Sequence, residues 1–62
     1  MFDSLEIGDF VTFVKDNERY AVVGKTRNRL MLSSKKEKLS LTEFMINKCY
    51  REGRINVEFG II

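Results

Sequence analysis

The chain contains no histidine, no proline and no tryptophan, and Cys49 is its only cysteine. A single cysteine cannot form an intramolecular disulfide, and without histidine a structural zinc site lacks its usual ligands. Ser-His-Asp and Cys-His arrangements are impossible, because histidine, the commonest general acid and base, is missing. The four glycines have neither Walker nor dinucleotide-binding spacing. We therefore expect neither an enzyme nor a bound metal or cofactor.

Long apolar runs are also missing. Uninterrupted apolar runs are only a few residues long, as in Phe44-Met45-Ile46, whereas a transmembrane helix requires roughly 20. No charged segment followed by a long apolar one suggests a secretory signal, and a lone cysteine is typical of a reducing compartment. We expect a cytoplasmic protein that does not span a membrane.

What is present suffices for one small domain, residues 1–62. The composition is 44% hydrophobic and 32% charged, which is typical of a chain that folds. No repeat or linker-like stretch divides it. Because so small a core leaves a thin margin of stability, self-association into a homodimer remains an open possibility.

Three apolar runs in the first half are predicted to be strands, and the first of them is rich in aromatic and β-branched residues, which suit a strand better than a helix. Polar turns separate them, so consecutive strands are expected to pair as antiparallel hairpins. In the second turn, Asn28 is the residue best able to take a left-handed conformation. The predicted strands are residues 10–14, 20–24 and 30–32, and a short fourth strand is expected around 38–40 after an exposed loop.

Residues 41–52 are predicted to form an amphipathic helix. Ser40 and Glu43 match a capping box, and Leu39 is placed to pack on Phe44 as a hydrophobic staple. Gly53 stands where a left-handed residue ends a helix. The side chains expected to face the sheet are Leu41, Phe44, Met45 and Cys49, with Ile46 and Tyr50 flanking them.

Residues 54–61 alternate polar and apolar side chains, which predicts a final strand with one buried face. Its buried set is expected to be Ile55, Val57, Phe59 and Ile61. Cys49 has Lys48 beside it, and a neighbouring cation lowers the pKa of a thiol. Its place on the apolar stripe favours core packing over a reactive role.

The expected order is three strands, a short strand, a helix and a final strand, with Gly8-Asp9 directly before Phe10-Val11. This order and the Gly-Asp step resemble the SH3-like small barrels, which include KOW and Tudor-type domains, over roughly residues 6–61. The predicted helix is longer than the single turn of that group, and no aromatic cage or proline-binding pattern is present, so no binding residue is carried over. The predicted fold class is α+β: a small bent antiparallel sheet, an SH3-like β-barrel with one amphipathic helix before the last strand.

Charge is distributed unevenly along the chain. The net charge is −3 over residues 1–24, +5 over residues 25–38 and zero over residues 39–62, in agreement with the total of +2. The carboxylates of the first third are interpreted as a solvated face, because no apolar residues are interleaved with them to form a pocket: Asp3, Glu6, Asp9, Asp16 and Glu18.

The basic stretch is a candidate for binding phosphate backbones, because a basic patch on a small barrel is a common electrostatic footprint of nucleic-acid binding. The candidate residues are Lys25, Arg27, Arg29, Lys35, Lys36 and Lys38. The alternative is that these side chains only solubilise loop tips and protect a sheet edge. No exposed aromatic pair accompanies them as a stacking platform.

A second candidate surface contains Tyr50, Arg51 and Arg54, because aromatic residues and arginine are favoured at the centres of protein interfaces. Tyr20 and Phe2 are candidates for the same surface, with core packing as the alternative. The sequence therefore predicts a non-enzymatic binding or regulatory module that acts through a protein partner. Nucleic-acid binding through residues 25–38 is the alternative function.

Overall fold

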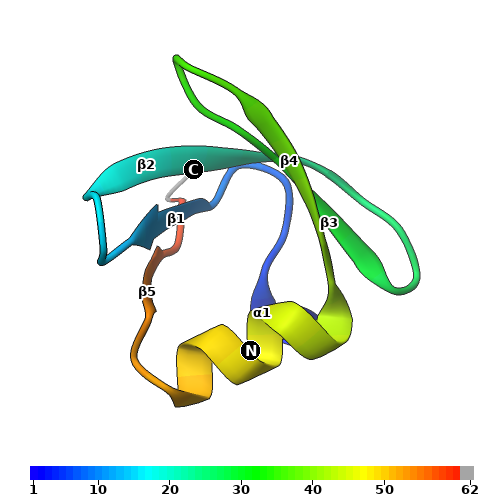
Figure 1. The fold of residues 1–62 in the computed structure, drawn as a ribbon. Coiled ribbons are helices and arrows are strands. Elements are labelled where there is room, and N and C mark those ends of the chain that lie inside the picture. The colour runs from blue at the N-terminus through cyan, green and yellow to red at the C-terminus, as the bar shows by residue number, and fades with distance from the viewer. Residues whose placement is uncertain (61–62) are drawn as a thin grey trace.

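The computed structural model describes residues 1–60, which form an α+β domain of five antiparallel strands with one 9-residue helix before the last strand (Figure 1). This confirms the predicted α+β class with one helix before the last strand. A 3₁₀ turn, η1, precedes the first strand. The elements are η1 Phe2–Ser4, β1 Phe10–Phe13, β2 Glu18–Lys25, β3 Arg29–Ser33, β4 Lys38–Thr42, α1 Glu43–Arg51 and β5 Ile55–Glu58.

The five strands form one sheet in the order β4-β3-β2-β1-β5, so the first and last strands are neighbours. The register of β2 against β3 shifts between Val22 and Gly24. A β-carbon on Gly24 would lie 3.1 Å from the terminal carbon of Met31, so the bulge brings the backbone close to that side chain. Such bulges increase the local bend of a sheet. The first three predicted strands are confirmed, and the fourth extends to Thr42.

The core lies between one face of this sheet, α1 and the N-terminal segment. Alternation along the strands points every second side chain to this side. The helix lies across the open side of the sheet in Figure 1, and η1 packs against it. The buried apolar residues are Phe2, Leu5, Val11, Tyr20, Val22, Leu30, Leu32, Ile46 and Ile55.

The N-terminal segment contributes more to this core than the sequence suggested. Phe2 and Leu5 are 3% and 0% exposed, and the Phe2 N–H donates to Asn47 Oδ1 on the helix at 2.8 Å. The Lys25 ammonium donates to the Leu5 carbonyl oxygen at 2.7 Å and lies 4.9 Å from the centre of the Phe2 ring. Residues 1–5 therefore close one side of the core.

The predicted start of the helix is wrong by two residues. Ser40 belongs to β4, and Thr42 caps the helix, because its Oγ1 accepts from the Met45 N–H at 3.2 Å. The capping box of Ser40 and Glu43 and the staple onto Phe44 therefore do not form. The physical reason is strand pairing: β4 stays in register with β3 as far as the pair of Arg29 and Thr42. The predicted end is confirmed, since Gly53 has a φ of 73° directly after the cap.

The face that the helix turns to the core also differs from the prediction. Ile46 is completely buried, whereas Phe44 is 68% and Met45 41% exposed. The later helix start and its attachment to β4 set the rotation of the helix, which the apolar spacing alone leaves ambiguous. Cys49 is half-buried and packs against the core, as predicted.

Two further local predictions are corrected. The final strand buries Ile55 and half-buries Val57, but it ends at Glu58 and leaves Phe59 52% exposed. After Glu58 the Gly60 N–H donates to the Asp9 carboxylate instead of continuing the strand pairing. Ile61 lies outside the described residues.

The β2–β3 turn also forms differently, because within residues 1–60 the only non-glycine residue with positive φ is Asn17, at 58°. Asn28 does not adopt the left-handed conformation. The Arg29 N–H donates to Thr26 Oγ1 at 3.1 Å, so a threonine hydroxyl closes this turn instead. Asn17 takes the left-handed conformation in the β1–β2 turn, where an asparagine side chain tolerates it.

Candidate functional site

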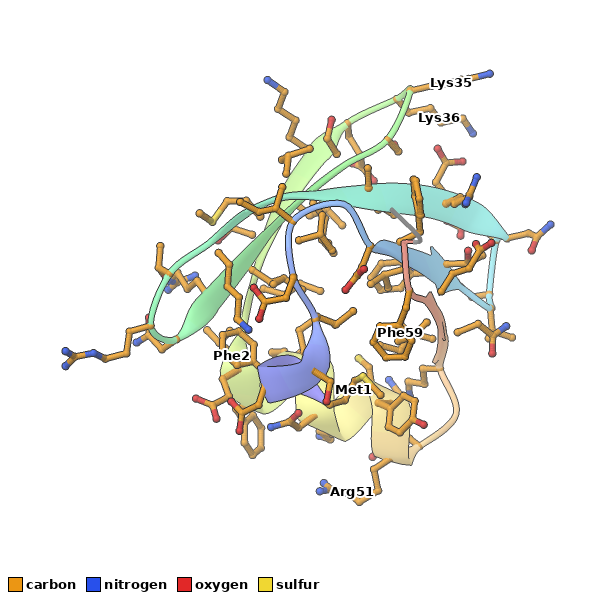
Figure 2. All side chains as sticks on the ribbon, turned by 180° about the vertical axis from the view of Figure 1, so that it is seen from behind. Met1, Phe2, Lys35, Lys36, Arg51 and Phe59 are labelled. Carbon is orange, nitrogen blue, oxygen red and sulfur yellow. The ribbon has the colours of Figure 1, made fainter. Side chains whose placement is uncertain are left out.

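The six cations of the basic stretch do not form one patch. Lys35 and Lys36 project from the tip of the β3–β4 loop, which lies far from the helix in Figure 2. Arg27 lies in the β2–β3 loop, at the other end of β3. A five-residue strand spans roughly 17 Å. A phosphate backbone at one loop therefore does not reach the other without crossing the outer face of the sheet.

Lys25 makes contacts within the fold and is not part of an exposed basic surface. Besides the Leu5 carbonyl oxygen, its ammonium lies 3.4 Å from Glu6 Oε2, and its side chain is only 19% exposed. Arg29 is exposed, and its Nη1 lies 3.5 Å from Ser40 Oγ. Lys36 lies 3.9 Å from Glu18 Oε1. Within residues 1–60, Lys35 and Lys38 have no ion-pair partner.

The second predicted group lies at the C-terminal end of the helix. Tyr50 is 48% exposed, and Arg51 and Arg54 are exposed. Arg54 Nε lies 3.0 Å from Glu52 Oε1. Tyr20 and Phe2, which were weighed for the same surface, are 2% and 3% exposed. Both belong to the buried core cluster.

A groove of about 420 Å³ adjoins this helix end. Its position depends on two backbone hydrogen bonds: the Val14 N–H donates to the Arg54 carbonyl oxygen at 3.0 Å, and the Arg54 N–H donates to the Cys49 carbonyl oxygen at 2.8 Å. These bonds hold the end of β1 beside the turn that follows α1. We call it the helix-end groove, and its lining residues are Phe13, Val14, Lys15, Cys49, Gly53 and Arg54.

The helix-end groove has an apolar floor and a basic rim. Phe13, Val14 and Cys49 supply the floor, and Val14 is 52% exposed. Lys15 and Arg54 supply the cations. Sequence reasoning found Arg54 but missed Val14 and Lys15, because only the tertiary fold brings the end of the first strand beside the end of the helix.

A second hollow, of about 560 Å³, lies on the outer face of the sheet. Ala21 pairs with Phe10 on one side and with Ser33 on the other, so small side chains lie beside an aromatic ring. We call it the outer-face hollow. It is lined by Phe10, Glu18, Arg19, Ala21, Ser33, Ser34 and Lys35.

Arg19 forms one wall of the outer-face hollow. Its guanidinium carbon lies 3.8 Å from the centre of the Phe10 ring, and its Nη2 lies 3.0 Å from Glu58 Oε1. Sequence reasoning counted Arg19 only as a charge of the acidic first third. The pairing of β1 with both β2 and β5 brings Arg19, Phe10 and Glu58 together.

Tyr20 is held by a carboxylate from the β3–β4 loop. Its hydroxyl donates to Glu37 Oε2 at 2.6 Å, and its ring packs edge-on against Phe13 with the ring centres 5.3 Å apart. The hydrogen bond to Glu37, together with burial, raises the pKa of Tyr20 from 10.0 to about 12. A tyrosine that keeps its proton in this way anchors the loop and is unsuited to act as a base near neutral pH.

Asp9 is not part of a solvated face, contrary to the prediction. It is 7% exposed, and its two carboxylate oxygens each accept a backbone N–H at 2.8 Å, one from Glu6 and one from Gly60. A β-carbon on Gly60 would lie only 2.2 Å from the Gly8 carbonyl oxygen, so glycine is required for this approach. Asp9 therefore ties the N-terminal segment to the residues after β5.

The described residues contain no cluster suited to metal binding, that is, no group of three or more Cys, Asp or Glu side chains placed to hold an ion. No helix within residues 1–60 has the length and apolar character needed to cross a membrane. Comparison with protein-family models, with curated proteins and with solved structures found no match to this chain.

Proposed function

We propose that this chain is a non-enzymatic binding module that acts through a protein partner, and that the partner binds at the helix-end groove. The observation that carries the proposal is the groove itself, where an exposed apolar floor lies at the end of the helix that carries Tyr50 and Arg51. Tyr50 follows Cys49 on the helix, and Arg54 lines the groove. Apolar centres with aromatic and arginine neighbours are typical of protein interfaces.

The exposed apolar side chains near the groove support the same proposal. Val14 and Tyr50 are each about half exposed, at 52% and 48%. Each has a fixed backbone position, the first through its bond to Arg54 and the second through the helix. A preformed apolar surface lowers the entropic cost of binding.

The same proposal includes an SH3-like architecture for the module. It is supported by the strand order β4-β3-β2-β1-β5, by the bulge that bends β2 and by the helix directly before the last strand. The Gly8-Asp9 step supports it as well, because Asp9 joins the start of β1 to the end of β5.

Selection from a random peptide library displayed on phage tests the proposal. We expect the wild-type protein to enrich peptides that carry an apolar anchor residue, because the floor of the groove is apolar. Arg54→Glu and Val14→Ser should each weaken an enriched peptide at least about tenfold in calorimetric titration. The amide resonances of Val14 and Cys49 should shift in the same titration.

Lys36→Glu is the matched control for Arg54→Glu, since it makes the same change of charge. Lys36 lies at the opposite end of the molecule from Arg51, which is the last residue of the helix beside the groove (Figure 2). Lys36→Glu should leave the peptide affinity within about twofold, because salt screens a charge that lies so far from the groove. Peptides that bind both groove variants as tightly as the wild type would overturn the proposal. So would a selection that enriches nothing.

A further inference from the structure

We propose that the outer face of the sheet is a second binding surface, which takes single-stranded nucleic acid, and that Arg19 is the residue on which a base stacks. This goes beyond the proposed protein partner and uses different residues. The central observation is the stack of Arg19 on Phe10, with the guanidinium carbon 3.8 Å from the ring centre. An arginine side chain held in this way presents a planar group beside the outer-face hollow.

Three neighbours hold Arg19 in place before any ligand arrives. Phe10 lies under the guanidinium, Glu58 Oε1 lies 3.0 Å from Arg19 Nη2, and the Arg19 backbone pairs with Thr12 of β1. The side chain still remains 52% exposed. Unstacked bases pack on arginine planes as well as on aromatic rings, so a fixed and exposed guanidinium suits a base.

The hollow offers room beside this plane. Its floor is made by Ala21 and Ser33, which pair directly across β2 and β3 and have small side chains. Its volume of about 560 Å³ falls within the range of roughly 300–1,000 Å³ that is common for small-ligand sites. Lys35 also lines the hollow.

The charges around the hollow favour an anion. Its carboxylates are already paired: Glu58 with Arg19, Glu18 with Lys36, and Glu37 with the Tyr20 hydroxyl. Lys35 and Lys38 have no ion-pair partner within residues 1–60 and are exposed. Lys38 pairs with Ser33 at the edge of the hollow. Two unpaired ammonium groups beside the planar guanidinium of Arg19 suit a nucleotide, in which a base is linked to a phosphate.

The structure also separates this surface from the carboxylates of the N-terminal segment. Glu6 pairs with Lys25, Asp9 is buried against backbone N–H groups, and η1, which contains Asp3, packs against α1. These groups therefore do not lie across the outer face. Of the carboxylates in the first third, Asp9 is therefore buried, and Glu6 and Glu18 are each paired with a lysine.

Fluorescence anisotropy with labelled 12-nucleotide oligothymidine and oligouridine tests the inference, with an abasic deoxyribose phosphate of the same length as the reference. The wild-type protein should bind at least one base-bearing oligomer at least about fivefold more tightly than the abasic one, since one stacked base contributes roughly this much. Affinity should fall roughly sevenfold between about 50 and 200 mM salt, as expected for about two phosphate contacts, those of Lys35 and Lys38. The two oligomers distinguish DNA from RNA as the source of the base.

Arg19→Lys is the decisive variant, because it keeps the charge and removes the planar group. It should bind the base-bearing oligomer at the affinity of the abasic one and leave the abasic affinity unchanged. Lys35→Glu and Lys38→Glu should weaken both oligomers by similar factors. Lys15→Glu, which makes the same charge change at the helix-end groove, should change neither by more than about twofold. A thermal melt of each variant shows that it is folded.

Three outcomes would overturn the inference. One is an Arg19→Lys variant that still prefers the base-bearing oligomer as strongly as the wild type. Another is equal weakening by Lys15→Glu and Lys35→Glu, which would mean that only net charge matters. The third is displacement of the oligomer by an oligoglutamate of equal charge at equal affinity, which would point to an acidic protein segment on this face. None of these results bears on peptide binding at the helix-end groove, so the two proposals fail independently.

Discussion

The core side and the outward side of the sheet differ in role: residues on the core side stabilise the fold, and residues on the outward side form the proposed binding surface. On the core side, nine apolar residues are 0–3% exposed and pack against one another. On the outward side of β1, β2 and β3 lie the stack of Arg19 on Phe10 and the small residues Ala21 and Ser33. Because adjacent residues of a strand point to opposite sides, each strand supplies both sets. Substitutions at two adjacent residues of one strand can therefore change stability and binding separately.

The largest effect is expected for Ile46→Ala, on the core side of the helix. Ile46 is completely buried, so truncation loses apolar burial and leaves a cavity, at a cost of about 2–5 kcal/mol. A core of this size rarely supplies more than roughly 3–5 kcal/mol of stability. We expect the variant to be largely unfolded at 25 °C by circular dichroism. A cooperative melt close to that of the wild type would show that the core side is not what holds the fold.

Asp9→Ala should have the next largest effect, of about 2 kcal/mol. It removes the acceptor of two backbone N–H groups, those of Glu6 and Gly60, and hydrogen bonds to a charged group are among the stronger ones. Urea unfolding measures the loss of stability, and amide exchange at Gly60 should become faster. Asp3→Ala, an exposed carboxylate in the same segment, is the control and should stay within about 0.5 kcal/mol. Equal effects of the two variants would contradict the role of Asp9.

A smaller effect, which depends on pH, is expected for Tyr20. Its pKa is raised from 10.0 to about 12 in the folded protein, so the protonated form is favoured by folding. The stability that this hydrogen bond contributes is fully present below pH 10 and is lost as the pH rises from 10 to 12. Urea unfolding of the wild type and Tyr20→Phe at pH 8, 10, 11 and 12 checks this.

Tyr20→Phe should be somewhat less stable than the wild type at pH 8, because Glu37 loses its donor. The difference between the two proteins should shrink towards pH 12. A difference that stays constant over this range would show that the Tyr20 hydroxyl keeps its ordinary pKa. Absorbance at 295 nm should also show one of the two tyrosines titrating near pH 12.

The smallest effect is expected for Phe44→Ser, on the outward side of the helix. Phe44 is 68% exposed although it lies only two residues before the completely buried Ile46. The substitution should change the free energy of unfolding by no more than about 0.5 kcal/mol in urea titration. A loss comparable to that of Ile46→Ala would mean that the apolar spacing had predicted the buried face correctly.

Elements that repeat a short pattern could be predicted from the sequence. Apolar runs between polar turns identified β1, β2 and β3, alternation identified β5, and Gly53 marked the end of the helix. The start of the helix was missed, because Ser40 is a good cap only if its backbone is not already paired with Met31 in the sheet. The buried face of the helix was missed for a related reason. Apolar residues at 44, 45 and 46 leave its rotation open until packing decides it.

The candidate sites were predictable to a smaller extent. Tyr50, Arg51 and Arg54 lie close together in sequence, so their proximity at the helix end required only the helix and its turn. The helix-end groove needs Val14, which is 40 positions before Arg54 along the chain. Arg19, Phe10 and Glu58 likewise meet only through the pairing of three strands. No local pattern signals such a meeting.

The sequence by itself determined the α+β class, the approximate strands, the single helix and the absence of histidine-based chemistry, because these follow from residue types and short periodicities. Only the tertiary structure decided which carboxylate is buried, which face of the helix is covered and which cations remain free. Asp9 becomes an internal acceptor and Lys25 an internal donor because the N-terminal segment folds back onto them. These outcomes depend on contacts between residues far apart in the chain, where packing and hydrogen bonding set the free energy rather than local preference.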